Sequence, residues 1–301
     1  MLKRALIVGI LALGLTGTAN AGPPFLNIEG EGGGGISPWA YLINPPEKGK
    51  MIGKPSIAAW QWIGNGYNFT FQSIAMNLFN RVELGFGVMD LDISEMRDDL
   101  FSATTLDLNE DHVRVFHIHA KVLALNESEY IPAVAFSAGY KWNTEMDELD
   151  KRLGGVFSSI GYDNDSSAEF TAVATKTIPW AIPTIVSAGV RLSRGHQLGL
   201  LGFSNKWSAN FESTIAILPS EKVAVGFEYK QKPDRMQSLG SLGLNTGRQQ
   251  DFTFREDDFI DWFFCYMPTS KLSFIIAWAT IGNVIHTEVE SIFAFNVKLD
   301  F

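Results

Sequence analysis

Hydrophobic and polar residues alternate along most of the chain after residue 56. Val223, Val225, Phe227 and Tyr229, for example, are separated by charged or small residues. Successive side chains of a β-strand point to opposite faces, so each such segment has one apolar and one mixed face. The pattern predicts twelve strands. They are residues 57–64, 67–79, 82–93, 111–125, 130–142, 168–178, 184–194, 207–218, 222–232, 257–267, 271–281 and 288–301.

The lengths of these segments and of their connections indicate a membrane barrel. Many segments have 10 to 14 residues, whereas strands of soluble proteins usually have about 5–6. Short turns alternate with long polar loops at residues 94–110, 143–167, 195–206 and 233–256. Outer-membrane barrels have short periplasmic turns, long outer loops and an even number of tilted strands. We therefore predict an all-β fold, a transmembrane antiparallel up-and-down β-barrel spanning residues 57–301.

The first 21 residues have the layout of a secretory signal peptide. Lys3 and Arg4 precede an apolar run from Ala5 to Leu15, and Ala19-Asn20-Ala21 fits a small-x-small cleavage site. The run is too short to span a bilayer, which takes about 20 residues. We expect export through the secretory pathway, cleavage after Ala21, and a location in the outer membrane of a Gram-negative cell.

The last eleven residues also point to the outer membrane. Phe295, Val297, Leu299 and Phe301 occupy alternate positions, and the chain ends on this aromatic residue. The segment resembles the assembly signal of bacterial outer-membrane barrels, which the barrel-insertion machinery reads. An ordinary terminal strand that happens to end in Phe is the alternative interpretation.

A second resemblance lies at the start of the expected mature chain. The stretch Gly22 to Tyr41, with its run Gly30-Glu31-Gly32-Gly33-Gly34-Gly35, resembles the start of an uncharacterised proteobacterial outer-membrane family, a domain of unknown function. The resemblance implies a location and an architecture for the mature chain. It implies no catalytic residue and no activity.

Residues 22–56 precede the barrel and have no strand pattern. Their glycines permit positive φ and close packing of the backbone. We expect an ordered segment that plugs the barrel or caps it on the periplasmic side, because Trp39, Tyr41, Leu42 and Ile43 are too apolar for a free leader. A flexible leader is the alternative. The glycine run lacks the Gly-Lys-Ser/Thr of a phosphate-binding loop.

If the apolar faces meet lipid, the opposite faces line the lumen. The candidate lumen-lining residues carry both charges in similar numbers, so either an ion-pair network fills the lumen or a narrow polar pore runs through it. The candidates are Glu83, His117, His119, Lys121, Lys141, Ser187, Arg191, Asn210, Glu212, Glu228, Lys230, Asp261, Asn296 and Lys298.

Two kinds of chemistry have weak support. His117 and His119 share a strand face and could hold a metal ion if Glu83 on a neighbouring strand supplied a third ligand. A Ser/His hydrolase could use His196 or His286, with Ser193, Ser204 or Ser291, but the sequence has no Gly-x-Ser-x-Gly motif. We therefore assign no catalytic, metal or cofactor-binding residue, and expect no cofactor.

Composition narrows the classes of partner. The net charge is −9, so nucleic acid, which binds basic surfaces, is excluded. The expected partners are outer-membrane lipid, lipopolysaccharide, the barrel-insertion machinery and small solutes. The pattern favours a narrow passive channel for small solutes. The alternatives are a plugged structural or interaction barrel without transport and, with less support, an outer-membrane enzyme acting on lipid.

Overall fold

Twelve antiparallel strands close into a barrel in the computed structural model, which describes residues 25–64, 67–284, 287–289 and 291–301. The last barrel strand, β18 (Ile292–Asp300), pairs with the first, β3 (Ser56–Gly64), and this pairing closes the ring. The closed antiparallel barrel confirms the predicted fold class. The expected signal peptide, residues 1–21, lies outside the described residues.

The barrel strands match the twelve predicted segments one for one. The ten between β3 and β18 are β4 (Tyr67–Leu78), β5 (Val82–Asp92), β6 (His112–Leu125), β7 (Ala133–Asn143), β8 (Ser166–Ile178), β9 (Thr184–Gly195), β10 (Phe203–Ser220), β11 (Val223–Lys230), β14 (Phe259–Thr269) and β15 (Leu272–Thr280). The largest boundary differences are at β10, which starts four residues earlier than predicted, and at β18, which starts four residues later. At β18 the difference arises because residues 287–289 pair within their own hairpin instead.

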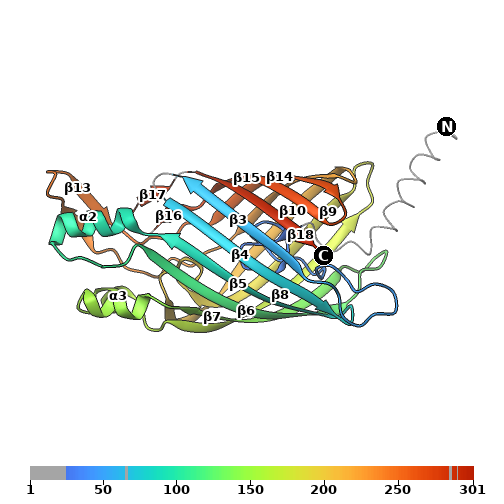
Figure 1. Ribbon diagram of the computed structural model, residues 1–301, viewed down its shortest axis with the longest axis horizontal. Helices are drawn as coiled ribbons and strands as arrows, with labels where there is room; N and C mark the ends of the chain where they lie inside the picture. The colour runs from blue at the N-terminus through green and yellow to red at the C-terminus, as the bar shows by residue number, and fades with distance from the viewer. Residues whose placement is uncertain (1–24, 65–66, 285–286, 290) are drawn as a thin grey trace.

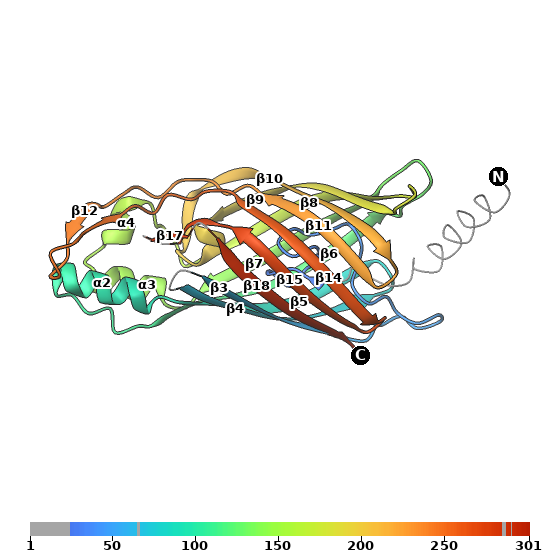
Figure 2. The ribbon, with the colours of Figure 1, turned by 90° about the horizontal axis from the view of Figure 1, so that it is seen from above.

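The long loops carry additional elements at one end of the barrel, and the C-terminus lies at the other (Figures 1 and 2). The additional elements are the helices α2 (Ser94–Thr104), α3 (Met146–Arg152) and α4 (Val156–Ile160), the 3-10 turn η2 (Gln197–Gly199), and the hairpins β12 (Gly240–Gly243) with β13 (Gln249–Phe252) and β16 (Gly282–Val284) with β17 (Thr287–Val289). No helix in the described part of the chain has the length and apolar character needed to cross a membrane.

Side chains alternate between lumen and exterior along each strand. On β5, Glu83 is fully buried and lies opposite Lys121 of β6, whereas Leu84 and Phe86 point outwards and are exposed. Exposed aromatic residues, among them Trp262 and Trp278 on adjacent strands, continue this apolar exterior. Apolar side chains outside and charged ones inside are what a barrel in lipid requires.

At the outer ends of β3 to β6 the two faces exchange character. Trp62, Phe69 and Phe71 point into the barrel. Trp62 packs edge to face on both phenylalanines, and its ring centroid lies 5.3 Å from that of Phe71. Thr70 and Asp90 face outwards at the same level and are register partners. A polar exterior around an apolar interior is the arrangement of a protein in water. We infer that these strand ends project beyond the bilayer.

The polarity of the exterior predicts that a lysine substitution costs more stability in the lipid-facing zone than in the polar zone at the outer strand ends. Ile276, at the middle of β15, is exposed towards lipid, so Ile276→Lys should destabilise the barrel by about 2–4 kcal/mol in lipid vesicles. Thr70→Lys in the polar zone should cost about 0–1 kcal/mol. Equilibrium unfolding in urea with vesicles present measures both. Equal costs at the two positions would contradict the proposed height of the bilayer.

Candidate functional site in the barrel lumen

Residues 25–43, here called the plug segment, occupy the lumen and are almost all buried (Figures 1 and 2). Two short strands, β1 (Phe25–Leu26) and β2 (Gly32–Gly33), pair with each other, and residues 27–31 form the turn between them. The side-chain oxygen of Asn27 accepts hydrogen bonds from the backbone N–H groups of Glu29 and Glu31. Gly30 has φ +75, a conformation that glycine adopts without strain.

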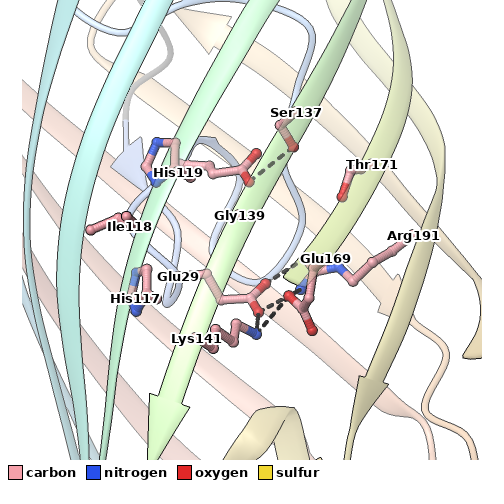
Figure 3. Close-up of a pocket in the computed structure, with 11 residues that line it drawn as sticks. Glu29, His117, Ile118, His119, Ser137, Gly139, Lys141, Glu169, Thr171 and Arg191 are labelled. Atoms are coloured by element: carbon pink, nitrogen blue, oxygen red, sulfur yellow. Dashed lines mark hydrogen bonds and ion pairs between the residues drawn. The ribbon is translucent and has the colours of Figure 1, made fainter. Parts of the chain in front are cut away.

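The turn directs Glu29 into a cluster of cations on the barrel wall (Figure 3). Its carboxylate pairs with Lys141 of β7 and with the guanidinium of Arg191 of β9. Lys230 of β11 completes the contact, with its Nζ 2.6 Å from Glu29 Oε2. All four side chains are at least 95% buried, so these ion pairs lie in a region with little water to screen them.

Two wall carboxylates share the same cations. Arg191 Nε lies 2.8 Å from Glu212 Oε1, and Lys141 Nζ lies 2.9 Å from Glu169 Oε2. The wall therefore contributes three cations and two carboxylates, 3 − 2 = +1, and Glu29 supplies the missing negative charge. Buried charge is tolerated only when it is paired, so the wall cluster is complete only with the plug segment in place.

Other wall carboxylates bind the backbone of the plug segment. Glu83 of β5 accepts hydrogen bonds from the N–H groups of Gly32 (2.8 Å) and Ile43 (2.7 Å). Lys121 lies 3.1 Å from Glu83 and also donates to the carbonyl of Gly32. These contacts satisfy backbone groups that have no partner in regular secondary structure, which a buried loop requires.

Glu228 of β11 acts in the same way near the end of the glycine run. Its Oε2 accepts from the N–H groups of Gly35 and Ile36, the latter at 2.9 Å, while its Oε1 accepts from Thr214 of β10. A Cβ atom on Gly34 would overlap the Glu228 carboxylate. The glycine run thus permits an approach of backbone to wall that a larger residue would prevent.

Aromatic residues complete the seat of the plug segment. Phe25 packs edge to face on Phe263 of β14, with centroids 5.1 Å apart, and lies beside Trp39. The indole of Trp39 donates to Thr214, and the indole of Trp60 of β3 donates to the carbonyl of Leu26. These rings fill the space between the polar contacts while every indole N–H named here has a partner.

The structure places all the candidate lumen-lining residues on barrel strands with buried side chains. Six of them form hydrogen bonds or ion pairs with the plug segment, and Glu212 is linked to it through Arg191 and Lys230. Asn296 instead donates to the carbonyl of Ala59, and Lys298 pairs with Asp300 at 2.8 Å. The six are Glu83, Lys121, Lys141, Arg191, Glu228 and Lys230.

Sequence reasoning missed the partners that the plug segment brings. Glu29 and Glu31 are isolated acids in a stretch otherwise free of charge from residue 22 to 46, and this isolation was the available signal. Glu169 was also missed, although it lies on the same face of its strand as the other buried polar residues. Trp60 and Phe263 were missed because an inward aromatic residue has the same period as a lipid-facing one.

Among the described residues, no three His, Cys, Asp or Glu side chains lie together in an arrangement that could hold a metal ion. The rings of His117 and His119 lie against Gly87 and Gly85 of β5, where any Cβ would overlap them. Glu83 comes within 3.4 Å of His119 but is directed at the plug segment and Lys121.

The residues of the hydrolase hypothesis are also committed elsewhere. His196 is fully buried, with Nε2 3.1 Å from the carbonyl of Gly161 and Nδ1 3.7 Å from Glu256. Ser193 donates to Glu169, and Ser204 donates to the carbonyl of Lys206. Neither serine is paired with His196, and His286 lies outside the described residues.

A second closure lies at the outer mouth. Residues 195–203, which link β9 to β10, cross the opening and are nearly all buried. Asn143 of β7 donates to the carbonyls of Gly199 and Leu200, and Gln197 donates to the carbonyl of Asn283 on the other side. Apolar side chains of the outer loops, including Phe157 and Phe254, extend the core above this mouth loop.

Comparison with known proteins places the chain in a family. A model of the family described as "Protein of unknown function (DUF3034)" matches residues 23–296. The chain belongs to this family. A search of curated proteins finds no match to its sequence.

Several solved structures are similar to this chain at low identity. The KdgM porin is 9% identical with a TM-score of 0.43, covering 82% of this chain and 99% of its own. LpxR from Salmonella typhimurium is 11% identical with a TM-score of 0.43, covering 82% and 100%. An outer membrane channel (COG4313) from Pseudomonas putida F1 is 10% identical with a TM-score of 0.40, covering 83% and 95%. This member of the family is a closed, twelve-stranded antiparallel β-barrel.

The glycine run yields a prediction about docking. Gly34→Ala should displace the plug segment because its Cβ would overlap Glu228, a cost of about 1–3 kcal/mol, or about 5- to 150-fold in an equilibrium. Hydrogen exchange of the Gly32, Gly35 and Ile36 amides should accelerate by that factor. Gly35→Ala, whose Cβ would lie 3.1 Å from Glu228, is the milder control. Unchanged exchange in Gly34→Ala would contradict the docking described here.

A buried lysine in the outer loops predicts a pH dependence. Lys232 lies 3.9 Å from the ring centroid of Phe259 and donates to the carbonyl of Ile281. Burial lowers the pKa of Lys232 from 10.5 to about 8. The unfolded chain therefore binds more protons between these values, and the contribution of Lys232 to stability rises with pH across this window.

The comparison is between the wild type and Lys232→Met, by thermal unfolding in detergent. The wild type should gain in melting temperature relative to the variant as the pH rises from about 8 to 10.5. Below the window the difference should be constant. Lys206→Met, at an exposed position, is the control. A difference that falls with rising pH would contradict the assignment.

Proposed function

We propose that the protein is an outer-membrane barrel that its own N-terminal segment holds closed, and that it conducts small solutes only when this segment leaves the lumen. The observation that carries the proposal is the wall cluster that Glu29 completes, because it ties closure to a specific set of ion pairs. Beside Glu29 only a small cavity of about 20 Å³ is left, room for about one water molecule.

The nature of the contacts supports a plug that can leave. The barrel ladder runs through all twelve strands without residues 25–43, so withdrawal breaks no strand pairing of the wall. The segment is connected to β3 by residues 44–55, most of which are exposed beyond the periplasmic end of β4. Polar contacts can be exchanged for water, whereas an apolar seat would oppose hydration of the lumen.

The second candidate is a plugged barrel that serves as an interaction platform and never conducts. The mouth loop, residues 195–203, and the apolar core above it favour this function, because they close the outer end independently of the plug segment. In either case the proposal includes export directed by residues 1–21 and contact with outer-membrane lipid and lipopolysaccharide. It also includes recognition of Phe295, Val297, Leu299 and Phe301 by the insertion machinery of a Gram-negative cell.

Single-channel recording separates the two candidates. Residues 22–301, refolded and inserted in a planar bilayer, should be silent because the lumen is filled. Gly34→Ala, which is expected to undock the plug segment, should show discrete conductance steps if the barrel is a closed channel. Steady conductance of the wild type would contradict the proposed closure. Silence of a folded Gly34→Ala with proven undocking would favour the interaction barrel.

A further inference from the structure

Lys141, Arg191 and Lys230 form a binding site for one carboxylate group. Figure 3 shows Lys141 and Arg191 around Glu29. Both oxygens of Glu29 are engaged: Oε1 by Lys141 and one nitrogen of Arg191, and Oε2 by the other nitrogen of Arg191 and by Lys230. A guanidinium that contacts both oxygens of one carboxylate provides geometric selectivity as well as charge. The three cations come from three different strands and lie together only in the closed barrel.

We propose that this cation cluster is a binding site for small organic carboxylates, which Glu29 occupies as an intramolecular ligand and which a free carboxylate can fill when Glu29 is absent. The inference rests on the proposed function, because in the intact protein the solute reaches the site only when the plug segment moves. It identifies the class of solute that the opened barrel would favour.

Charge balance selects a monoanion. With Glu169 and Glu212 in place the wall cluster has a net charge of +1, which one carboxylate neutralises. A doubly charged phosphate would leave a buried excess of −1 beside these two acids, and a neutral solute would leave the excess of +1. Glu169 and Glu212 therefore limit the charge of the ligand that can bind. The two guanidinium nitrogens of Arg191 limit its shape, because they contact both oxygens of one carboxylate.

The surroundings indicate a short side chain on that carboxylate. The cavity of about 20 Å³ that borders Glu29 is lined by His117, Ser137 and Thr171. Removal of the Glu29 side chain would add the volume of its methylene groups to this cavity. Acetate and propionate fit such a space, and hydroxyl groups of Ser137 and Thr171 border it.

Chemical rescue of Glu29→Ala tests the site. The variant leaves the wall cluster with an unpaired charge, and breaking a buried ion pair in this way costs about 3–5 kcal/mol. We expect a melting temperature below that of the wild type in chloride and a saturable increase with acetate or propionate. Acetamide, which has the same shape without charge, should give no increase. The wild type, whose site is filled, should not respond to acetate beyond its response to chloride.

Two further variants make the outcome decisive. Glu31→Ala removes a buried acid that contacts Ser137 and no cation of the cluster, so acetate should not rescue it. Glu29→Gln keeps the volume without the charge and reports whether the fold tolerates an uncharged segment. A folded Glu29→Ala without an acetate response overturns the proposal, as does an equal response in the wild type or in Glu31→Ala.

If Glu29→Ala folds only in acetate, the proposal is supported. If it folds in neither salt while Glu29→Gln folds, the site does not accept a free carboxylate and the proposal fails. These readouts need no conductance, so failure of the carboxylate site is distinguishable from failure of the proposed closure, which the silence of the wild-type channel tests.

Discussion

Charges buried in the middle of the barrel must be neutralised within the barrel, and most of the lumen is arranged around this constraint. Lys141, Arg191 and Lys230 stand on three strands with only two wall carboxylates to balance them. The third carboxylate is delivered by Glu29 on a turn 112 residues before the nearest of these cations in the chain. Docking of the plug segment and neutralisation of the buried cations of the wall therefore depend on one another.

The lumen has a polar zone and an apolar zone, which follow one another along the barrel axis. Where the plug segment lies, the wall presents acids and bases that bind backbone and Glu29. Above it, Trp62, Phe71 and their neighbours form an apolar core that continues into the outer loops. The polar zone lies inside the lipid-facing part of the barrel, whereas the apolar zone lies inside strand ends with a polar exterior. At each height the polarity of the lumen is thus opposite to that of the barrel exterior. The change from one arrangement to the other occurs within single strands.

That change explains how far the sequence could predict the structure. Period-two alternation shows which residues share a face, and it located all twelve barrel strands. It also grouped the charged lumen-lining residues, because lipid cannot accept Glu83 or Lys121 on the outside. It could not show that Trp60 and Phe71 point inwards, since an aromatic residue is acceptable on either face. The hairpin β16–β17 replaced the predicted start of β18 because local pairing of three residues leaves no period to detect.

The docked position of the plug segment was beyond sequence reasoning for a different reason. Its decisive contacts join residues separated by 112 to 201 positions, and nothing local links Glu29 to Arg191 or Lys230. The glycine run could be interpreted only as a capacity for close approach. The structure shows that this surface is the wall at Glu228, whose carboxylate occupies the space that a side chain on Gly34 would need.

The same charges that hold the plug segment make an open lumen physically acceptable. Water entering the barrel after withdrawal would solvate Lys141, Arg191, Glu83 and Glu228, so the ion pairs lost to the segment would be replaced by hydration. An apolar seat offers no such exchange and would collapse or remain dry. The polar contacts of residues 25–43 therefore lower the free-energy difference between filled and hydrated lumens, whereas the apolar contact of Phe25 with Phe263 acts in the opposite direction. The apolar mouth above it keeps the outer end closed by a separate set of contacts. Of these two sets of contacts, only the polar contacts of the plug segment are replaced by water without loss of solvation.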